Sequence, residues 1–151
     1  MTMNFSGPGE WYARWPHFKP EELACKHCGA LPDELDTQLL DNLELLRAAL
    51  GKSLKVNSAH RCRQHNLLVG GAAYSQHKSL AVDLSLTGHE PLEVYRQALR
   101  IGFLGIGLGT SFIHLDMRRK IDGHQPVRRL TVWYYNNKAK WDRILKDDRL
   151  S

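Results

Sequence analysis

The sequence predicts an α+β fold in a single domain, and three features of the chain support this class. A leucine stripe indicates a helix at residues 32–50, alternating segments indicate strands near 80–86 and 112–117, and helices and strands follow one another in mixed order. A regular alternation of strands and helices would favour an α/β fold instead. With 151 residues, 42% of them hydrophobic, the chain can bury one core without disulfides. We therefore expect a small antiparallel sheet with flanking helices.

The N-terminal stretch is the least regular part of the chain. Residues 1–19 are rich in Gly, Pro and aromatic residues and have no periodicity, so we predict a loop that packs Trp11 and Trp15 onto the body. Residues 20–151 then form the domain that carries the functional site. Pro20 opens a short helical turn, because proline is favoured at a first helical position.

Further elements follow from apolar periodicity and from breaker residues. In the 32–50 helix the apolar residues recur at steps of three and four, Pro32 opens the helix and Gly51 closes it; the stripe consists of Leu35, Leu39, Leu43, Leu46 and Leu50. We predict further helices at 63–69, at 90–101 (built on Leu92, Tyr95 and Leu99) and at 138–147 (anchored by Trp141). Further strands are predicted at 54–58, 103–108 and 131–135.

The charge of the chain favours an anionic partner. The formal net charge is +5, which suits cell-wall polymer, nucleic acid or lipid headgroups without choosing among them. No stretch approaches the roughly 20 apolar residues that a bilayer span needs. The N-terminus has no basic region followed by an apolar one, so we expect no signal peptide, synthesis in the cytoplasm, and export, if any, by another route.

Cysteine usage argues against a disulfide scaffold. The chain has three cysteines, Cys25, Cys28 and Cys62, which is a low and odd number. Cys25 and Cys28 have the spacing of half a zinc knuckle, and His27, His60 or Cys62 remain as candidates to complete it. Buried thiols, or a link from Cys25 or Cys28 to Cys62, are the favoured readings.

A carboxylate and two histidines stand out in otherwise apolar surroundings. Asp83 lies between Val82 and Leu84 in a predicted strand, where a buried charge needs a partner such as a metal or an arginine. In the second strand His114 and Asp116 are two residues apart and so share a face. His77 precedes the first strand and can close the set from a loop.

Two histidines and one carboxylate with an open fourth position form a catalytic zinc site, in which zinc activates a water molecule as nucleophile. Asp116 is then either the general base or the group that orients His114. Arg61 is a candidate to stabilise the oxyanion. Each signal has an ordinary alternative: a lone strand histidine is usually structural, and Asp83 can equally pair with Arg61.

The ordered set of motifs resembles metallopeptidase family fifteen, the zinc D-Ala-D-Ala carboxypeptidase and phage endolysin family, which shares its fold with the hedgehog signalling domain. The resemblance runs from about residue 18 to residue 116 and rests on a series of short elements in the family's order. These are Ala24-Cys25-Lys26-His27-Cys28-Gly29, Ser58-Ala59-His60-Arg61, Cys62-Arg63-Gln64-His65-Asn66, Val69-Gly70-Gly71-Ala72, Ser75-x-His77, Ala81-x-Asp83 and Phe112-Ile113-His114-Leu115-Asp116.

The resemblance implies a zinc peptidase domain over residues 20–151. It implies His77, Asp83 and His114 as zinc ligands, Arg61 as the group that polarises the scissile carbonyl, and Ser75 as a substrate contact. Two departures are visible: His77 and Asp83 are six positions apart where the family pattern has seven, and Ser111 stands where many members carry a catalytic Glu. Asp116 is the substitute expected in the His-x-Asp branch.

Three functions compete on this basis. The first is a monomeric zinc peptidase that cleaves peptidoglycan stem or cross-link peptides, as a phage endolysin or a wall-remodelling enzyme acting after release to the wall. Carboxypeptidase and endopeptidase activity, with D,D or L,D stereochemistry, stay open. The second is a catalytically inactive zinc-containing module that binds the cell wall. The third, a basic nucleic-acid-binding domain with a Cys25/Cys28 knuckle, is disfavoured because it leaves the His and Asp strands unexplained.

Overall fold

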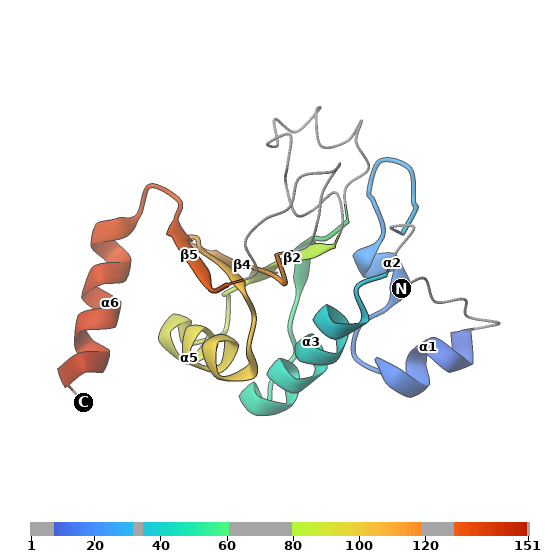
Figure 1. Cartoon of the computed structure of the whole chain (residues 1–151), viewed down its shortest axis with the longest axis horizontal. Helices are drawn as coiled ribbons and strands as arrows, with labels where there is room; N and C mark the ends of the chain where they lie inside the picture. Colours follow the sequence, from blue (N-terminus) through green and yellow to red (C-terminus); the bar gives the residue numbers. More distant parts are fainter. Residues whose placement is uncertain (1–7, 32–34, 61–79, 119–128, 151) are drawn as a thin grey trace.

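The computed structural model describes residues 8–31, 35–60, 80–118 and 129–150, and its centre is a five-stranded sheet (Figure 1). The strand order is β1-β2-β4-β3-β5, in which the first three neighbouring pairs are antiparallel and β5 runs parallel to β3. The expected α+β class is confirmed, although the sheet is mixed and not wholly antiparallel. The strands are β1 (Val56–Ser58), β2 (Ala81–Ser85), β3 (Gly105–Leu108), β4 (Phe112–Asp116) and β5 (Thr131–Tyr134).

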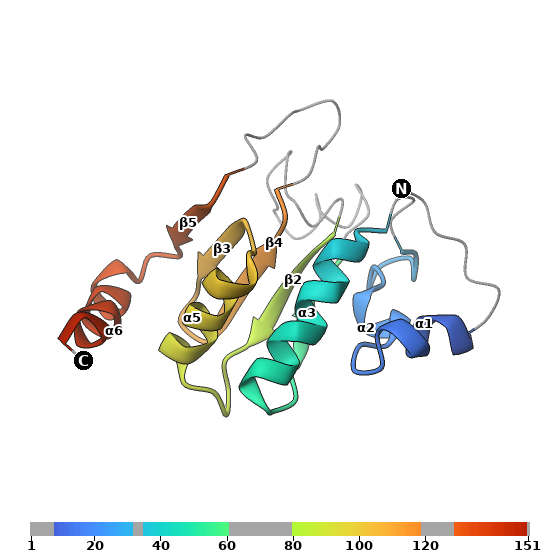
Figure 2. The same cartoon turned by 60° about the horizontal axis from the view of Figure 1, so that its bottom comes forward.

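Helices cover one face of this sheet and extend past both of its ends. Helices α3 and α5 lie side by side beneath the strands, whereas α1 and α2 lie towards one end of the molecule and α6 towards the other (Figures 1 and 2). None of the helices in the described ranges combines the length and apolarity that a bilayer span requires. The helices are α1 (Pro8–Arg14), α2 (Pro20–Leu23), α3 (Thr37–Leu50), α5 (Pro91–Ile101) and α6 (Lys138–Leu150).

The two faces of the central strands differ in chemistry, as their alternating pattern predicts. The residues on the core face are at most 1% exposed: Val82, Leu84, Ile106, Leu108, Ile113 and Leu115. The opposite face carries Asp83, His114 and Asp116. Because successive strand residues point to opposite sides, the apolar core and the polar site are built from the same two strands.

The prediction of a loop over residues 1–19 is wrong for residues 8–14, which form α1. The helix is only seven residues long, too short to show an apolar period, and it is held by tertiary contacts. Trp11 and Trp15 are 3% and 0% exposed, so their predicted packing onto the body is confirmed. Asp41 of α3 accepts hydrogen bonds from the indole of Trp15 and from the guanidinium of Arg14.

The long helix begins later than the leucine pattern indicates. Asp36 caps it by accepting the Leu39 N–H at 3.1 Å, and Gly51 ends it in the left-handed conformation. Pro32, expected to open the helix, lies outside the described residues. A helix start is therefore set by the capping side chain and not by the first apolar residue.

The predicted apolar face of the helix at 90–101 is partly wrong, since Tyr95 packs against the core but Leu99 is exposed. Leu92 and Tyr95 are only partly buried and Leu99 is 36% exposed, whereas Val94 and Ala98 are buried. The smaller side chains face the core because α5 packs closely against α3 there. In α6, by contrast, Trp141 is the predicted anchor: it is 1% exposed and its indole donates to the Gly109 carbonyl at 2.9 Å.

Candidate metal centre

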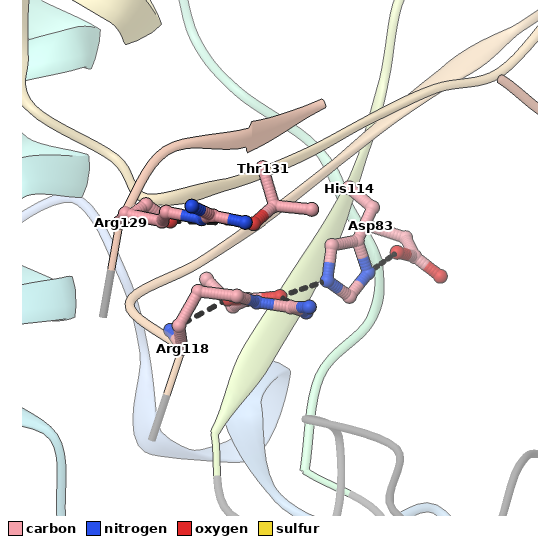
Figure 3. A network of polar contacts seen from close by, with 6 residues as sticks. Asp83, His114, Arg118, Arg129 and Thr131 are labelled. Atoms are coloured by element: carbon pink, nitrogen blue, oxygen red, sulfur yellow. Dashed lines mark hydrogen bonds and ion pairs between the residues drawn. The ribbon is translucent and has the colours of Figure 1, made fainter. Parts of the chain in front are cut away.

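The polar face of the sheet brings two of the three predicted zinc ligands together. Asp83 of β2 and His114 of β4 are register partners on neighbouring strands. Asp83 Oδ1 lies 3.1 Å from His114 Nδ1, and the two side chains point towards each other in Figure 3. The sequence placed both residues on one face, and the structure confirms this.

His77, Ser75 and Arg61 lie outside the described residues, as do Cys62 and the predicted 63–69 helix. Within the described ranges, no group of three or more His, Cys, Asp or Glu side chains is arranged to hold a metal ion. The described part of the chain therefore supplies two candidate ligands, and the third ligand stays a prediction.

The two described ligands fit zinc in chemistry and in spacing. Zinc binds imidazole nitrogen and carboxylate oxygen at about 2.0–2.1 Å, so two donors on one tetrahedral ion lie roughly 3.3 Å apart. The observed separation of 3.1 Å between Asp83 Oδ1 and His114 Nδ1 is close to this value. Both residues would hold the ion on the open side of the sheet, with Nδ1 as the donor nitrogen of His114.

The other ring nitrogen of His114 faces Asp116. Nε2 lies 2.5 Å from Asp116 Oδ2, and the Asp116 side chain is fully buried. A carboxylate on the far nitrogen of a metal-binding histidine fixes the tautomer and the ring orientation. These contacts fit the role in which Asp116 orients the His114 ring. A role of Asp116 as general base stays a prediction.

The contacts of His114 and Asp116 shift the pKa values of both side chains. Burial alone would lower the pKa of His114, but hydrogen bonds to Asp116 and Asp83 outweigh burial, and the pKa is raised above 6.5. Burial alone would raise the pKa of Asp116, but hydrogen bonds from Arg118 and His114 outweigh it and hold this pKa at about 2. Without metal, these contacts favour the protonated form of His114 between the two carboxylates.

Glycines on β3 leave room for the site. Gly105 pairs with Asp116, and a Cβ at position 105 would overlap the Asp116 carboxylate. Gly107 pairs with both His114 and Trp133, and a Cβ there would lie 2.8 Å from the Trp133 ring. Both glycines are therefore close-approach positions within a strand.

Two residues beside the site were not identified from the sequence. Arg118 donates to Asp116 from its backbone N–H and its side chain. Trp133 is half-buried, and its ring centroid lies 5.1 Å from that of His114. The two-residue spacing of Asp116 and Arg118 was the available signal, since it resembles that of His114 and Asp116.

The two described cysteines lie in one short turn. Cys25 is buried and Cys28 is exposed, and the turn between them is closed by the Gly29 N–H donating to the Cys25 carbonyl at 2.7 Å. His60 is 8% exposed, and its backbone N–H donates to the Leu23 carbonyl. The pairing of Cys62 lies outside the described residues.

Comparison with known proteins agrees with this geometry. The sequence model of the family described as Peptidase M15 matches residues 16–116, about two thirds of the chain. The chain therefore belongs to the Peptidase M15 family, and it is a peptidase whose substrates are peptides. Peptidases of this family are generally zinc-dependent. No curated protein matches the chain closely enough to count as a relative.

Proposed function

We propose that the chain is a zinc-dependent peptidase that hydrolyses amide bonds in peptidoglycan peptides, with His77, Asp83 and His114 as its zinc ligands. The observation that carries this proposal is the approach of Asp83 to His114 Nδ1 at 3.1 Å on the polar face of a Peptidase M15 chain. The net charge of +5 supports an anionic polymer such as the cell wall as the location of the substrate.

The proposed division of labour follows from position and chemistry. When bound, zinc would polarise the scissile carbonyl and activate water. His114 and Asp83 hold the ion, Asp116 orients the His114 ring through Nε2, and Arg61 stabilises negative charge on the carbonyl oxygen. Ser75 contacts the peptide. The attacking water would need a base to accept its proton. Asp116 is the candidate named from the sequence, but its carboxylate is fully buried and already bound by Arg118 and His114, which favours the orienting role.

The decisive experiment is mass analysis of muropeptides after incubation of purified sacculi with the zinc-loaded protein. We expect new peptide termini, and the masses identify the bond as D,D or L,D and the enzyme as a carboxypeptidase or an endopeptidase. His77→Ala and His114→Ala should each abolish both zinc binding and cleavage. His17→Ala is the matched control, because His17 is an exposed histidine paired with Glu44 and remote from the site. Full cleavage by His77→Ala would refute the ligand assignment.

A phage endolysin and a wall-remodelling enzyme are two settings for this activity. We propose the endolysin role, because a basic peptidase of this size needs only access to the wall to act. Loss of turbidity when the protein is added to permeabilised cells is the expected result. Cleavage of isolated muropeptides without lysis of permeabilised cells would favour remodelling.

A second candidate function is a zinc-containing module that binds the wall without cleaving it. Ser111 favours it, since this exposed residue begins the turn into β4 three positions before His114, where many relatives carry a catalytic Glu. This candidate predicts that the protein sediments with sacculi and releases no new peptide termini.

A further inference from the structure

Arg118 directs three donors at one buried carboxylate. Its backbone N–H and its Nε donate to Asp116 Oδ1, each at 2.7 Å, and its Nη2 donates to Asp116 Oδ2. Asp116 is 0% exposed and uses the same Oδ2 to contact His114 Nε2. A carboxylate held by three donors cannot rotate freely, so its position relative to the imidazole is fixed.

Arg118 is itself held in an unusual conformation. Its φ is +53°, in the left-handed region that residues with side chains rarely adopt, and this places the N–H of residue 118 on the carboxylate two residues earlier. Its guanidinium lies over the Trp133 ring at 4.9 Å from the centroid. Trp133 in turn stacks beside His114, so backbone and indole together hold the guanidinium in place.

These contacts form one continuous chain across the polar face, from Arg118 to Asp116, His114 and Asp83. Figure 3 shows His114 between Asp83 on one side and the Arg118 guanidinium on the other. Because Asp116 occupies Nε2, the nitrogen left to face Asp83 is Nδ1. The arrangement thus leaves Nδ1 of His114 as the nitrogen that can bind zinc beside Asp83.

We propose that Arg118 is a positioning residue of the zinc site, which acts through Asp116 to hold His114 with Nδ1 turned to Asp83. The inference rests on the zinc site of the proposed function and adds to it a residue that the sequence analysis did not identify. The alternative role for a cation beside the site is direct contact with the peptide substrate, and the two roles make different predictions.

The test compares Arg118→Gln, Arg118→Lys and the wild-type protein by zinc binding without peptide, and separately by the KM for peptide hydrolysis. Zinc dissociation constants are measured by competition with a chromophoric chelator, and the His114 ring nitrogens are followed by NMR in the metal-free protein. Both variants keep a side chain on the left-handed backbone: Gln removes the positive charge, whereas Lys keeps the charge without the forked guanidinium. Arg96→Gln is the control, because Arg96 is an exposed arginine on α5 whose carboxylate partner is Glu93.

Arg118→Gln should weaken zinc binding about tenfold, the lower end of the effect typical for groups that orient metal ligands, and should shift the His114 nitrogen signals. Arg118→Lys should recover part of the affinity, and Arg96→Gln should match the wild type. Unchanged zinc affinity and unchanged nitrogen signals in Arg118→Gln would overturn the proposal, and a rise in KM alone would assign Arg118 to the substrate instead.

Zinc binding is measured without peptide, so this part of the test does not depend on peptidase activity. A protein that binds zinc but leaves sacculi intact contradicts the proposed function and still permits a positive result for Arg118. A wild-type protein that binds no zinc would overturn both.

Discussion

At the scale of single residues, the site depends on small side chains as much as on reactive ones. Trp133 of β5 reaches His114 of β4 across β3, where Gly107 has no side chain, and Gly105 of β3 leaves the space that the Asp116 carboxylate occupies. The sequence identified Asp83, His114 and Asp116 because polar residues in apolar strands are conspicuous. It did not identify the function of Gly105, because a glycine reveals a close approach only once the neighbouring strand is known.

Gly105→Ala should destabilise the protein and weaken its zinc binding. The added methyl group overlaps the buried Asp116 carboxylate, which is held by Arg118 and has no free volume to move into. Overpacking of this kind typically costs about 1–3 kcal/mol of unfolding free energy, measurable by urea denaturation. Gly9→Ala in α1 is the control, since a Cβ at that position meets nothing within 4 Å. Equal stability of the two variants would contradict the close-approach role.

Zinc binding should strengthen with pH through the neutral range. The raised pKa of His114 means that its contacts with Asp116 and Asp83 stabilise the metal-free fold fully below the unfolded value of about 6.5, and that this contribution is lost as pH rises through the folded pKa. A metal must displace the Nδ1 proton, so it competes best above that pKa.

Chelator competition between about pH 6 and pH 8 measures this dependence. Asp116→Asn removes one of the two groups that raise the His114 pKa, so its affinity curve should move to lower pH. An affinity independent of pH would show that the His114 proton is not displaced.

At the scale of elements, the strands of the site were the most predictable part of the molecule. Residues 81–85 and 112–116 alternate strictly, and their two faces are as the sequence predicts. Helix details were less predictable for physical reasons. α3 begins at the Asp36 cap, α5 turns Val94 and Ala98 to the core because of its packing on α3, and α1 is too short for periodicity to identify.

Helix α3 offers a direct test of which leucines form the core. Leu43 is fully buried, whereas Leu45 on the same helix is 56% exposed. Leu43→Ala should lower the free energy of unfolding by about 2–5 kcal/mol, and Leu45→Ala, the matched control, should change it by less than about 0.5 kcal/mol. Urea denaturation of both variants provides the measurement. A comparable loss in both would contradict the burial pattern.

At the scale of the whole molecule, the folded body extends beyond the segment that the family comparison matches. The match covers residues 16–116, yet Trp11, Trp15 and Trp141, which lie outside it, are all buried in the same core. Removal of residues 1–15 deletes two of these indoles and the ion pair between Arg14 and Asp41.

The truncated chain 16–151 should therefore be markedly less stable than the full chain. Loss of a buried aromatic side chain typically costs about 3–5 kcal/mol, and this deletion removes two. Thermal unfolding followed by circular dichroism measures the loss. A truncated chain as stable as the full one would show that residues 1–15 do not contribute to the stability of the fold.

The strand β5 joins the edge of the sheet beside β3 and places Trp133 against His114, yet it lies outside the matched residues 16–116. The ligand-bearing strands and the indole that borders them thus come from separable portions of the sequence. The Trp133 ring also lies against the Arg118 guanidinium, which holds Asp116 in place, so exchange of the segment 129–150 should change the zinc affinity. The segment that follows the matched residues is thus part of the support of the metal site.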